Sequence, residues 1–240
     1  MRSSSSWLGR TLKHSSRTPL LLLLKDPNLL YQLTPEASES ILSADGSFSV
    51  RHGAAENPRT PPHRLVALAD DINSVVRIGV ALNKSTPGAS LDALANNEDD
   101  EIRVCVSRNP STPIETLARL GRDTNEDVRR GAAQNPSAPT SLLLMLVADI
   151  PEVRVELAMN KKAPASILEC LASDNNEQVR EGVASHPSAP PSVLVLLATD
   201  PNPHTRYCVA KNPQTPSSVI AQLERDLVPR VRDAAKRVAN

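Results

Sequence analysis

The chain has 240 residues, 40% of them hydrophobic, and its 27 basic side chains balance 27 acidic ones. It has one Trp, two Tyr and one Phe, so its core is aliphatic and it lacks the aromatic platforms on which single-stranded nucleic acids stack. Residues 1–25 hold five basic and no acidic side chains, which leaves 22 basic against 27 acidic residues elsewhere. An acidic remainder of this kind argues against binding a phosphate backbone.

The N-terminal segment differs in composition from everything that follows. Residues 1–19 are basic, rich in Ser and without a core pattern, which predicts a disordered tail. Two alternatives are a transit-type targeting segment and a membrane-surface arm through Trp7, Leu8 and Leu12. Residues 20–33 contain a leucine run too short to span a membrane, and we interpret them as a degenerate N-terminal cap of the region 34–240.

Residues 34–240 are built from one repeated unit. An arginine, mostly preceded by Val, recurs every 26 residues with a single interval of 25, at Arg51, Arg77, Arg103, Arg129, Arg154, Arg180, Arg206 and Arg232. A proline preceded by Thr or Ala follows the same period, at Pro35, Pro61, Pro87, Pro113, Pro139, Pro164, Pro190 and Pro216. This spacing predicts eight repeats, one of which has lost a residue in the linker between Asp149 and Val153.

Each repeat predicts two helices. The first begins at Thr-Pro, where Thr is expected to cap the helix and Pro to take the first helical position, and Thr112 with Glu115 forms a candidate capping box. Its apolar stripe includes Leu117 and Leu120, at helical spacing. The second helix begins around Val-Arg, spans about two turns, presents small residues such as Gly131 to the core and ends at Asn-Pro. Neither helix buries its stripe alone, so we predict an all-α solenoid, an elongated monomer in which neighbouring repeats share a continuous core.

The repeat from Asn109 to Asn135, NPSTPIETLARLGRDTNEDVRRGAAQN, resembles those of the leucine-rich repeat variant (LRV) family, which read roughly NPxTPxxxLxxLAxDxxxxVRxxVA. The resemblance covers about residues 34–240 and implies a right-handed superhelix of alternating α- and 3₁₀-helices. One member of the family carries an iron–sulfur cluster on N-terminal cysteines. No Cys precedes Cys105 here, so we expect a colourless protein without a cofactor.

The chain's cysteines and histidines show no metal-ligand spacing. Cys105 and Cys208 occupy a position that is Gly or Ala in five other repeats, which indicates small buried side chains, whereas Cys170 is expected to be more exposed. His186 stands where six other repeats have Asn, so we interpret it as a structural substitute. The small number of cysteines favours a reducing, cytoplasmic compartment.

Two polar columns invite a functional interpretation, but each has a structural one that we favour. The Asn column is expected to bond backbone groups at the turn between helices; it comprises Asn57, Asn83, Asn109, Asn135, Asn160 and Asn212. The Arg column could bind phosphate, but a column of acids balances it: Asp45, Asp71, Asp123, Asp149, Asp174, Asp200 and Asp226, with Asn97 in the remaining repeat. We predict ion pairs between these columns, either within a repeat or with the next.

Columns that vary are free to carry specificity. One follows the repeated Arg and contains His52, Ile78, Val104, Arg130, Val155, Glu181, Tyr207 and Asp233. The other precedes the Asn column and contains Glu56, Leu82, Arg108, Gln134, Met159, Ser185, Lys211 and Arg237. They are four residues apart and so share one side of the second helix, which by analogy with other solenoids is the shorter, concave-face helix. We predict that Arg108, Arg130, Gln134 and Tyr207 contact a partner, although inter-repeat packing would also explain the apolar members.

No phosphate-binding loop, nucleophile elbow or paired-carboxylate motif occurs. The pattern therefore favours a non-enzymatic scaffold that binds an unidentified protein or peptide through its concave face. Two alternatives remain at this stage: a helical-repeat protein that binds nucleic acid, and an enzyme whose residues converge on a concave face.

Overall fold

The computed structural model describes residues 48–239, and the chain divides into a compact unit that ends at Pro113 and a second unit, Ile114–Asn240. Every regular element in the described residues is an α-helix. None of these helices is long and apolar enough to cross a bilayer. The tail predicted at residues 1–19, the cap predicted at 20–33 and the start of the first repeat lie outside the described residues.

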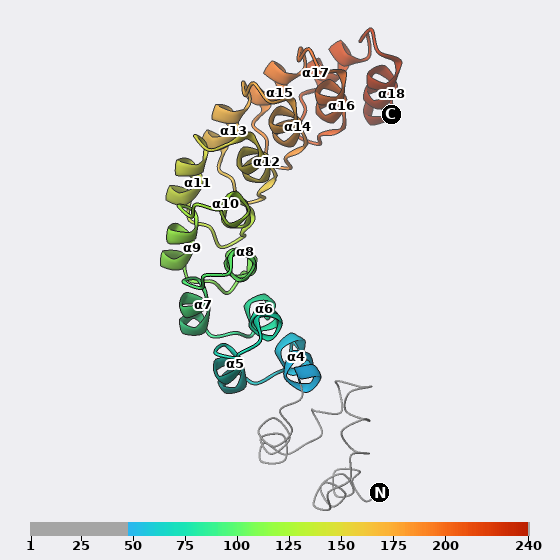
Figure 1. Ribbon diagram of the computed structural model, residues 1–240. Helices are drawn as coiled ribbons and strands as arrows, with labels where there is room; N and C mark the ends of the chain where they lie inside the picture. The colour runs from blue at the N-terminus through green and yellow to red at the C-terminus, as the bar shows by residue number, and fades with distance from the viewer. Residues whose placement is uncertain (1–47, 240) are drawn as a thin grey trace, which may run out of the picture. The chain divides into compact units, whose positions relative to one another are not determined.

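The helices alternate between two lengths (Figure 1). The first helices of the repeats have seven residues: α5 (Pro62–Leu68), α7 (Gly88–Leu94), α9 (Ile114–Leu120), α11 (Thr140–Leu146), α13 (Ala165–Leu171), α15 (Pro191–Leu197) and α17 (Ser217–Leu223). The second helices have nine: α4 (Phe48–Glu56), α6 (Ser74–Leu82), α8 (Asp100–Arg108), α10 (Glu126–Gln134), α12 (Pro151–Met159), α14 (Glu177–Ser185) and α16 (Pro203–Lys211). The last, α18 (Pro229–Ala239), has eleven. The predicted all-α repeat architecture is confirmed, but the second helix is the longer of each pair and is α-helical, not 3₁₀.

Second helices pack on one another along each unit. In the first unit α4 contacts α6 and α6 contacts α8; in the second, the series runs α10, α12, α14, α16 and α18. Figure 1 shows the first helices of the second unit, from α11 to α17, in a separate row. Small residues allow the second helices to approach closely: a Cβ at Gly182 would lie 3.0 Å from the Cβ of Ala158. The core between the rows is aliphatic, with Leu143, Leu168 and Leu194 almost fully buried.

The first helices do not begin as the sequence predicted. The Pro of each Thr/Ala-Pro is the residue before the helix, as at Pro87 with φ −60° and ψ 143°, and the Thr does not cap. The hydroxyl of Thr112 donates instead to the carbonyl of Val106, at 2.6 Å, in the preceding second helix. The capping box predicted for Thr112 and Glu115 is therefore wrong. Thr60, Thr86 and Thr215 make the same bond, so this Thr ties the end of one helix to the start of the next.

The second helices are capped by side chains that the sequence analysis did not single out. An Asn or Asp precedes each of five of them, and its side-chain oxygen accepts from a backbone N–H of the first turn: Asn73, Asp99, Asn125, Asn176 and Asn202. Such caps stabilise a helix by about 1 kcal/mol each.

The short repeat absorbs its missing residue in the linker, as predicted. Asp149 accepts from the N–H of the next residue, Ile150, at 2.8 Å, whereas Asp174 accepts from Asn176, two residues on. The residue that is lost is the capping one, because Ile150 precedes α12 and has no side-chain bond to it. Pro151 at the first helical position compensates in part, since it has no N–H to cap.

Candidate functional site

The Asn column forms a ladder between successive repeats. The Nδ2 of Asn83 donates to the carbonyls of Ala55 and Asn57, both at 2.8 Å, and its Oδ1 accepts from the N–H of Ser85 at 2.9 Å. Asn109, Asn160 and Asn212 repeat this arrangement and are almost fully buried. The structural interpretation of the column is confirmed, because these amides are consumed by backbone groups.

His186 performs the same task with an imidazole. Its Nε2 lies 3.0 Å from the carbonyl of Asn160, and its Nδ1 accepts from the N–H of Ser188 at 3.1 Å. This arrangement places the ring proton on Nε2, so the ring reproduces the donor and acceptor of an amide. The predicted structural role of His186 is confirmed.

The Arg column pairs with carboxylates of the next repeat. The Nε and Nη2 of Arg129 donate to the two oxygens of Asp149 at 2.7 and 3.0 Å, and Nη1 donates to the carbonyl of Asp123 at 2.9 Å. We call this arrangement a rung. Rungs of this form join Arg51 to Asp71, Arg129 to Asp149, Arg154 to Asp174, Arg180 to Asp200 and Arg206 to Asp226. The prediction that the column is structural is confirmed for these five.

Each rung is largely shielded from water. The side chains of Arg129 and Asp149 are 17% and 14% exposed. Burial raises the pKa of Asp149, but the hydrogen bonds from Arg129 and from the N–H of Ile150 outweigh it and hold the pKa below its ordinary value. The carboxylate therefore stays charged in a site where an unpaired charge would be unfavourable.

The cysteines show no arrangement for ligation. Cys105 and Cys208 are half-buried, less than predicted, and burial raises the pKa of both thiols; Cys170 is exposed, as expected. Within residues 48–239, no group of three or more His, Cys, Asp or Glu side chains is placed to hold a metal ion.

The four predicted partner contacts lie on three helices, α8, α10 and α16. Arg108 is exposed in the last turn of α8, in the first unit. In the second unit, Arg130 is held by Asp127 at 2.9 Å and Glu156 at 3.1 Å. Gln134 is exposed at the end of the same helix, α10.

Tyr207, on α16, is half-buried among cations. The guanidinium of Arg230 lies 4.4 Å from its ring centroid, and the imidazole of His204 stacks on it at 5.8 Å. Tyr207 is thus engaged within the chain, as Arg130 is, whereas Gln134 projects into solvent.

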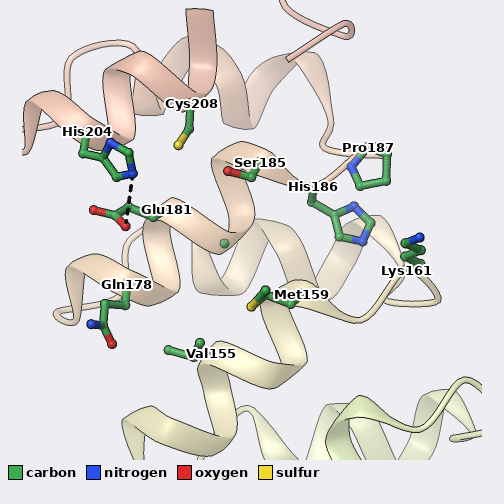
Figure 2. A pocket seen from close by; sticks show the side chains of 11 residues that line it. Val155, Met159, Lys161, Gln178, Glu181, Ser185, His186, Pro187, His204 and Cys208 are labelled. Atoms are coloured by element: carbon green, nitrogen blue, oxygen red, sulfur yellow. Dashed lines mark ion pairs between the residues drawn. The ribbon is translucent and has the colours of Figure 1, made fainter. Parts of the chain in front are cut away.

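A groove of about 470 Å³ opens on the second-helix side of α12, α14 and α16 (Figure 2). Both variable columns contribute to its lining, through Val155, Met159, Glu181 and Ser185. The groove is thus lined by members of both predicted columns, but by other members than those that the sequence favoured. The sequence feature that could have indicated the groove is Met159, which is apolar in a mostly polar column. In the structure this side chain is 61% exposed.

The groove has an apolar floor and charged ends. In Figure 2, Glu181 and Lys161 lie on opposite sides of the view, with Met159 near the centre and Val155 below. The amide of Asn202 orients Glu181 by donating to its Oε1 at 3.0 Å, and the Nε2 of His204 lies 3.9 Å from its Oε2. This arrangement offers a cationic side chain a pre-oriented carboxylate beside an aliphatic surface.

The architecture defines the chain as an α-helical repeat protein, and comparison with known proteins specifies the kind. A model of the family "Leucine rich repeat variant" matches residues 177–202, which is one full repeat period. A solved structure described as "a leucine-rich repeat variant with a novel repetitive protein structural motif" is 27% identical, covering 80% of this chain and 77% of that one with a TM-score of 0.58. The resemblance to the leucine-rich repeat variant family is confirmed.

Two designed proteins are also similar. Designed armadillo repeat protein YIII(Dq)4CqI is 15% identical over 96% of both chains, with a TM-score of 0.25. Designed armadillo repeat protein YIII(Dq.V1)4CPAF, in complex with the peptide (KR)4, is 14% identical over 99% of this chain and 98% of that one, with a TM-score of 0.23. The comparison with curated proteins finds no match.

Proposed function

We propose that the protein is a non-enzymatic scaffold that binds an extended protein segment on the second-helix side of the unit Ile114–Asn240. The groove at α12, α14 and α16 carries the proposal, because it joins exposed apolar surface to an oriented carboxylate. Met159 and Val155 would take an aliphatic side chain, and Glu181 a Lys or Arg next to it. Gln134 and Arg130, on α10, would extend the surface, as would Tyr207 on α16.

Acidic side chains around the groove favour a cationic segment, although Lys161 lines the groove itself. The first turns of α10, α12 and α14 carry acids on this unit, namely Glu126, Asp127, Glu152 and Glu177. Glu156 and Glu181 add to them one turn later, although Arg130 neutralises part of this charge. Complementary charge steers encounter and suppresses wrong partners more than it adds affinity, so the apolar floor is expected to supply most of the binding free energy.

The test is a selection of random displayed peptides on the full chain, followed by affinity measurements on the enriched peptides. We expect these to combine a Lys or Arg with an aliphatic residue. Met159→Lys and Glu181→Lys should each weaken binding by about tenfold or more, because truncation or reversal at a central contact typically removes over 1 kcal/mol.

The matched control is Leu196→Lys, which introduces the same charge on α15 at a residue with comparable exposure, 51%. It should leave peptide affinity unchanged. Peptides that bind the Met159→Lys variant normally but lose affinity for the Leu196→Lys variant would move the binding face to the first helices. The paired variant Arg108→Glu/Arg130→Glu, against substitutions at Glu115 and Arg119, asks how far the surface extends.

A further inference from the structure

One rung of the Arg column lacks its carboxylate. In the first unit Arg77 has Asn97 at the position where the five complete rungs have Asp, 20 residues after the arginine. The Nη1 of Arg77 makes the usual bonds, to the carbonyls of Asp71 at 2.7 Å and Ile72 at 3.2 Å. Its Nε is buried and has no hydrogen-bond partner among the described residues.

The missing bond follows from the chemistry of Asn97. The N–H of Asp99 donates to the Oδ1 of Asn97 at 3.1 Å, as the equivalent N–H donates to one Asp oxygen in the other rungs. The second terminal atom of Asn97 is therefore the amide nitrogen, a donor, where a rung aspartate offers the oxygen that accepts from Arg Nε. The Nε of Arg77 and the amide nitrogen of Asn97 are therefore both donors, and Nε has no acceptor among the described residues.

A cavity of about 260 Å³ lies at this position, lined by Asp71, Arg77, Leu94 and Asn97 together with Ala69, Asp70 and Ala93. The carboxylate of Asp71 is already taken up by Arg51. Its proximity does not exclude a second anion, because a complete rung in the second unit places two carboxylates in the same relation: Arg154 bonds Asp174 and the carbonyl of Asp149, whose own carboxylate is held by Arg129.

Asp70 is an additional acid that has no counterpart in the complete rungs. It is exposed, so water screens its repulsion of a ligand. The charges around the cavity then resemble those of a complete rung from which the carboxylate that accepts from Arg Nε has been removed.

We propose that this open rung binds a carboxylate group supplied from outside the chain. The ligand's two oxygens would accept from Nε and Nη2 of Arg77 in the bidentate geometry that Arg129 shows with Asp149, and one oxygen would also accept from the amide of Asn97. A guanidinium fork is suited to this recognition because its donors are fixed in one plane. The source is either a free small carboxylate or a Glu or Asp side chain of a bound protein, and the shared chemistry is the carboxylate.

The experiment uses the full chain and saturation-transfer NMR at neutral pH with two probes, acetate and the blocked peptide acetyl-Gly-Glu-Gly-amide. The key variant is Asn97→Asp, which keeps Arg77 and supplies the carboxylate from within. We expect a transfer signal from the wild type and an approximately fivefold or greater loss of it in Asn97→Asp. The thermal midpoint should rise in that variant and cease to depend on acetate, with sodium chloride at equal ionic strength as the salt control.

Two further variants bracket the result. Arg77→Gln should also lose the signal, and Asp149→Asn, which recreates the Asn97 arrangement in the second unit, should gain one. A signal from acetate alone identifies a free acid as the ligand, and a signal from the peptide identifies a protein side chain. The proposal is overturned if neither probe gives a signal. It is also overturned if Asn97→Asp binds both probes as the wild type does. The Asn97→Asp result decides the question even if Arg77→Gln fails to fold.

Discussion

The complete rung at Arg129 and the open rung at Arg77 begin with the same side chain in the same place on the second helix. Both arginines donate through Nη1 to the carbonyl six residues earlier, at 2.9 and 2.7 Å. They differ in the residue 20 positions later, Asp149 in one and Asn97 in the other, which changes one oxygen to nitrogen. In the first case the Nε, Nη1 and Nη2 of the guanidinium all donate within the fold; in the second, Nε has no hydrogen-bond partner among the described residues.

This comparison shows that a column's average character does not settle the role of each member. The repeated arginine is structural because its aspartate partner is also repeated. One substitution of that partner leaves the guanidinium without its carboxylate. The predictions below test the difference, from the largest expected effect to the smallest.

Acid should weaken four of the five complete rungs together. Interactions with arginine and backbone N–H groups hold the pKa below its ordinary value for Asp71, Asp149, Asp174 and Asp226. A carboxyl with a depressed folded-state pKa stabilises the fold above its unfolded pKa, about 4, and loses that contribution as pH falls through the folded value. We therefore expect the free energy of unfolding to fall steadily below about pH 5.

Urea unfolding between pH 7 and pH 3 measures this dependence. The Asp149→Asn variant should show a shallower decline than the wild type, because one titrating group has been removed. A free energy of unfolding that stays constant down to pH 3 would contradict the assignment of the rungs as stabilising ion pairs.

Removing one arginine of a complete rung should have the next largest effect. Arg129→Ala leaves the carboxylate of Asp149 mostly buried without its main partner, so we expect a loss of about 3 kcal/mol. The double variant Arg129→Ala/Asp149→Ala should recover part of it, since the orphaned charge is then absent. Denaturant midpoints compare the three proteins, and an unchanged midpoint in Arg129→Ala would mean that the rung contributes little.

The same change at the open rung should have the smallest effect. Arg77→Ala removes the bond to the carbonyl of Asp71 but also removes a buried unsatisfied donor, so we expect a change within about 1 kcal/mol. A loss as large as that of Arg129→Ala would show that Arg77 already has a strong partner, and would undermine the proposed carboxylate site.

Much of the fold could be predicted because the same residue types recur at the same positions in several repeats. The Arg–Asp pairing and the turn role of Asn and His186 followed from columns that agree across repeats. The role of Thr112 was missed because the same Thr-Pro pair suits a helix cap. In the structure the Pro precedes the helix, with an extended backbone at Pro87, and the hydroxyl of Thr112 donates to the carbonyl of Val106.

The candidate site was less predictable because it depends on contacts that no column records. Arg130 and Tyr207 were favoured as polar members, but Glu156 and Arg230 occupy them within the chain. The exception at Asn97 was visible in the sequence, yet its meaning required the register of the rungs, which link each arginine to the following repeat.

The ladders also run in opposite directions. In the second unit, Arg180 reaches forward to Asp200, whereas Asn212 reaches back to the carbonyls of Ala184 and His186. Where both the rung and the Asn bonds are present, as between these repeats, the junction is held from both sides. Excising or duplicating one whole repeat would reproduce the same junction, and the 25-residue repeat shows that a residue can also be lost in the linker after Asp149 with both sets of bonds intact. Whole repeats could therefore be gained or lost by unequal recombination of the gene, because the interface between neighbouring repeats would stay the same.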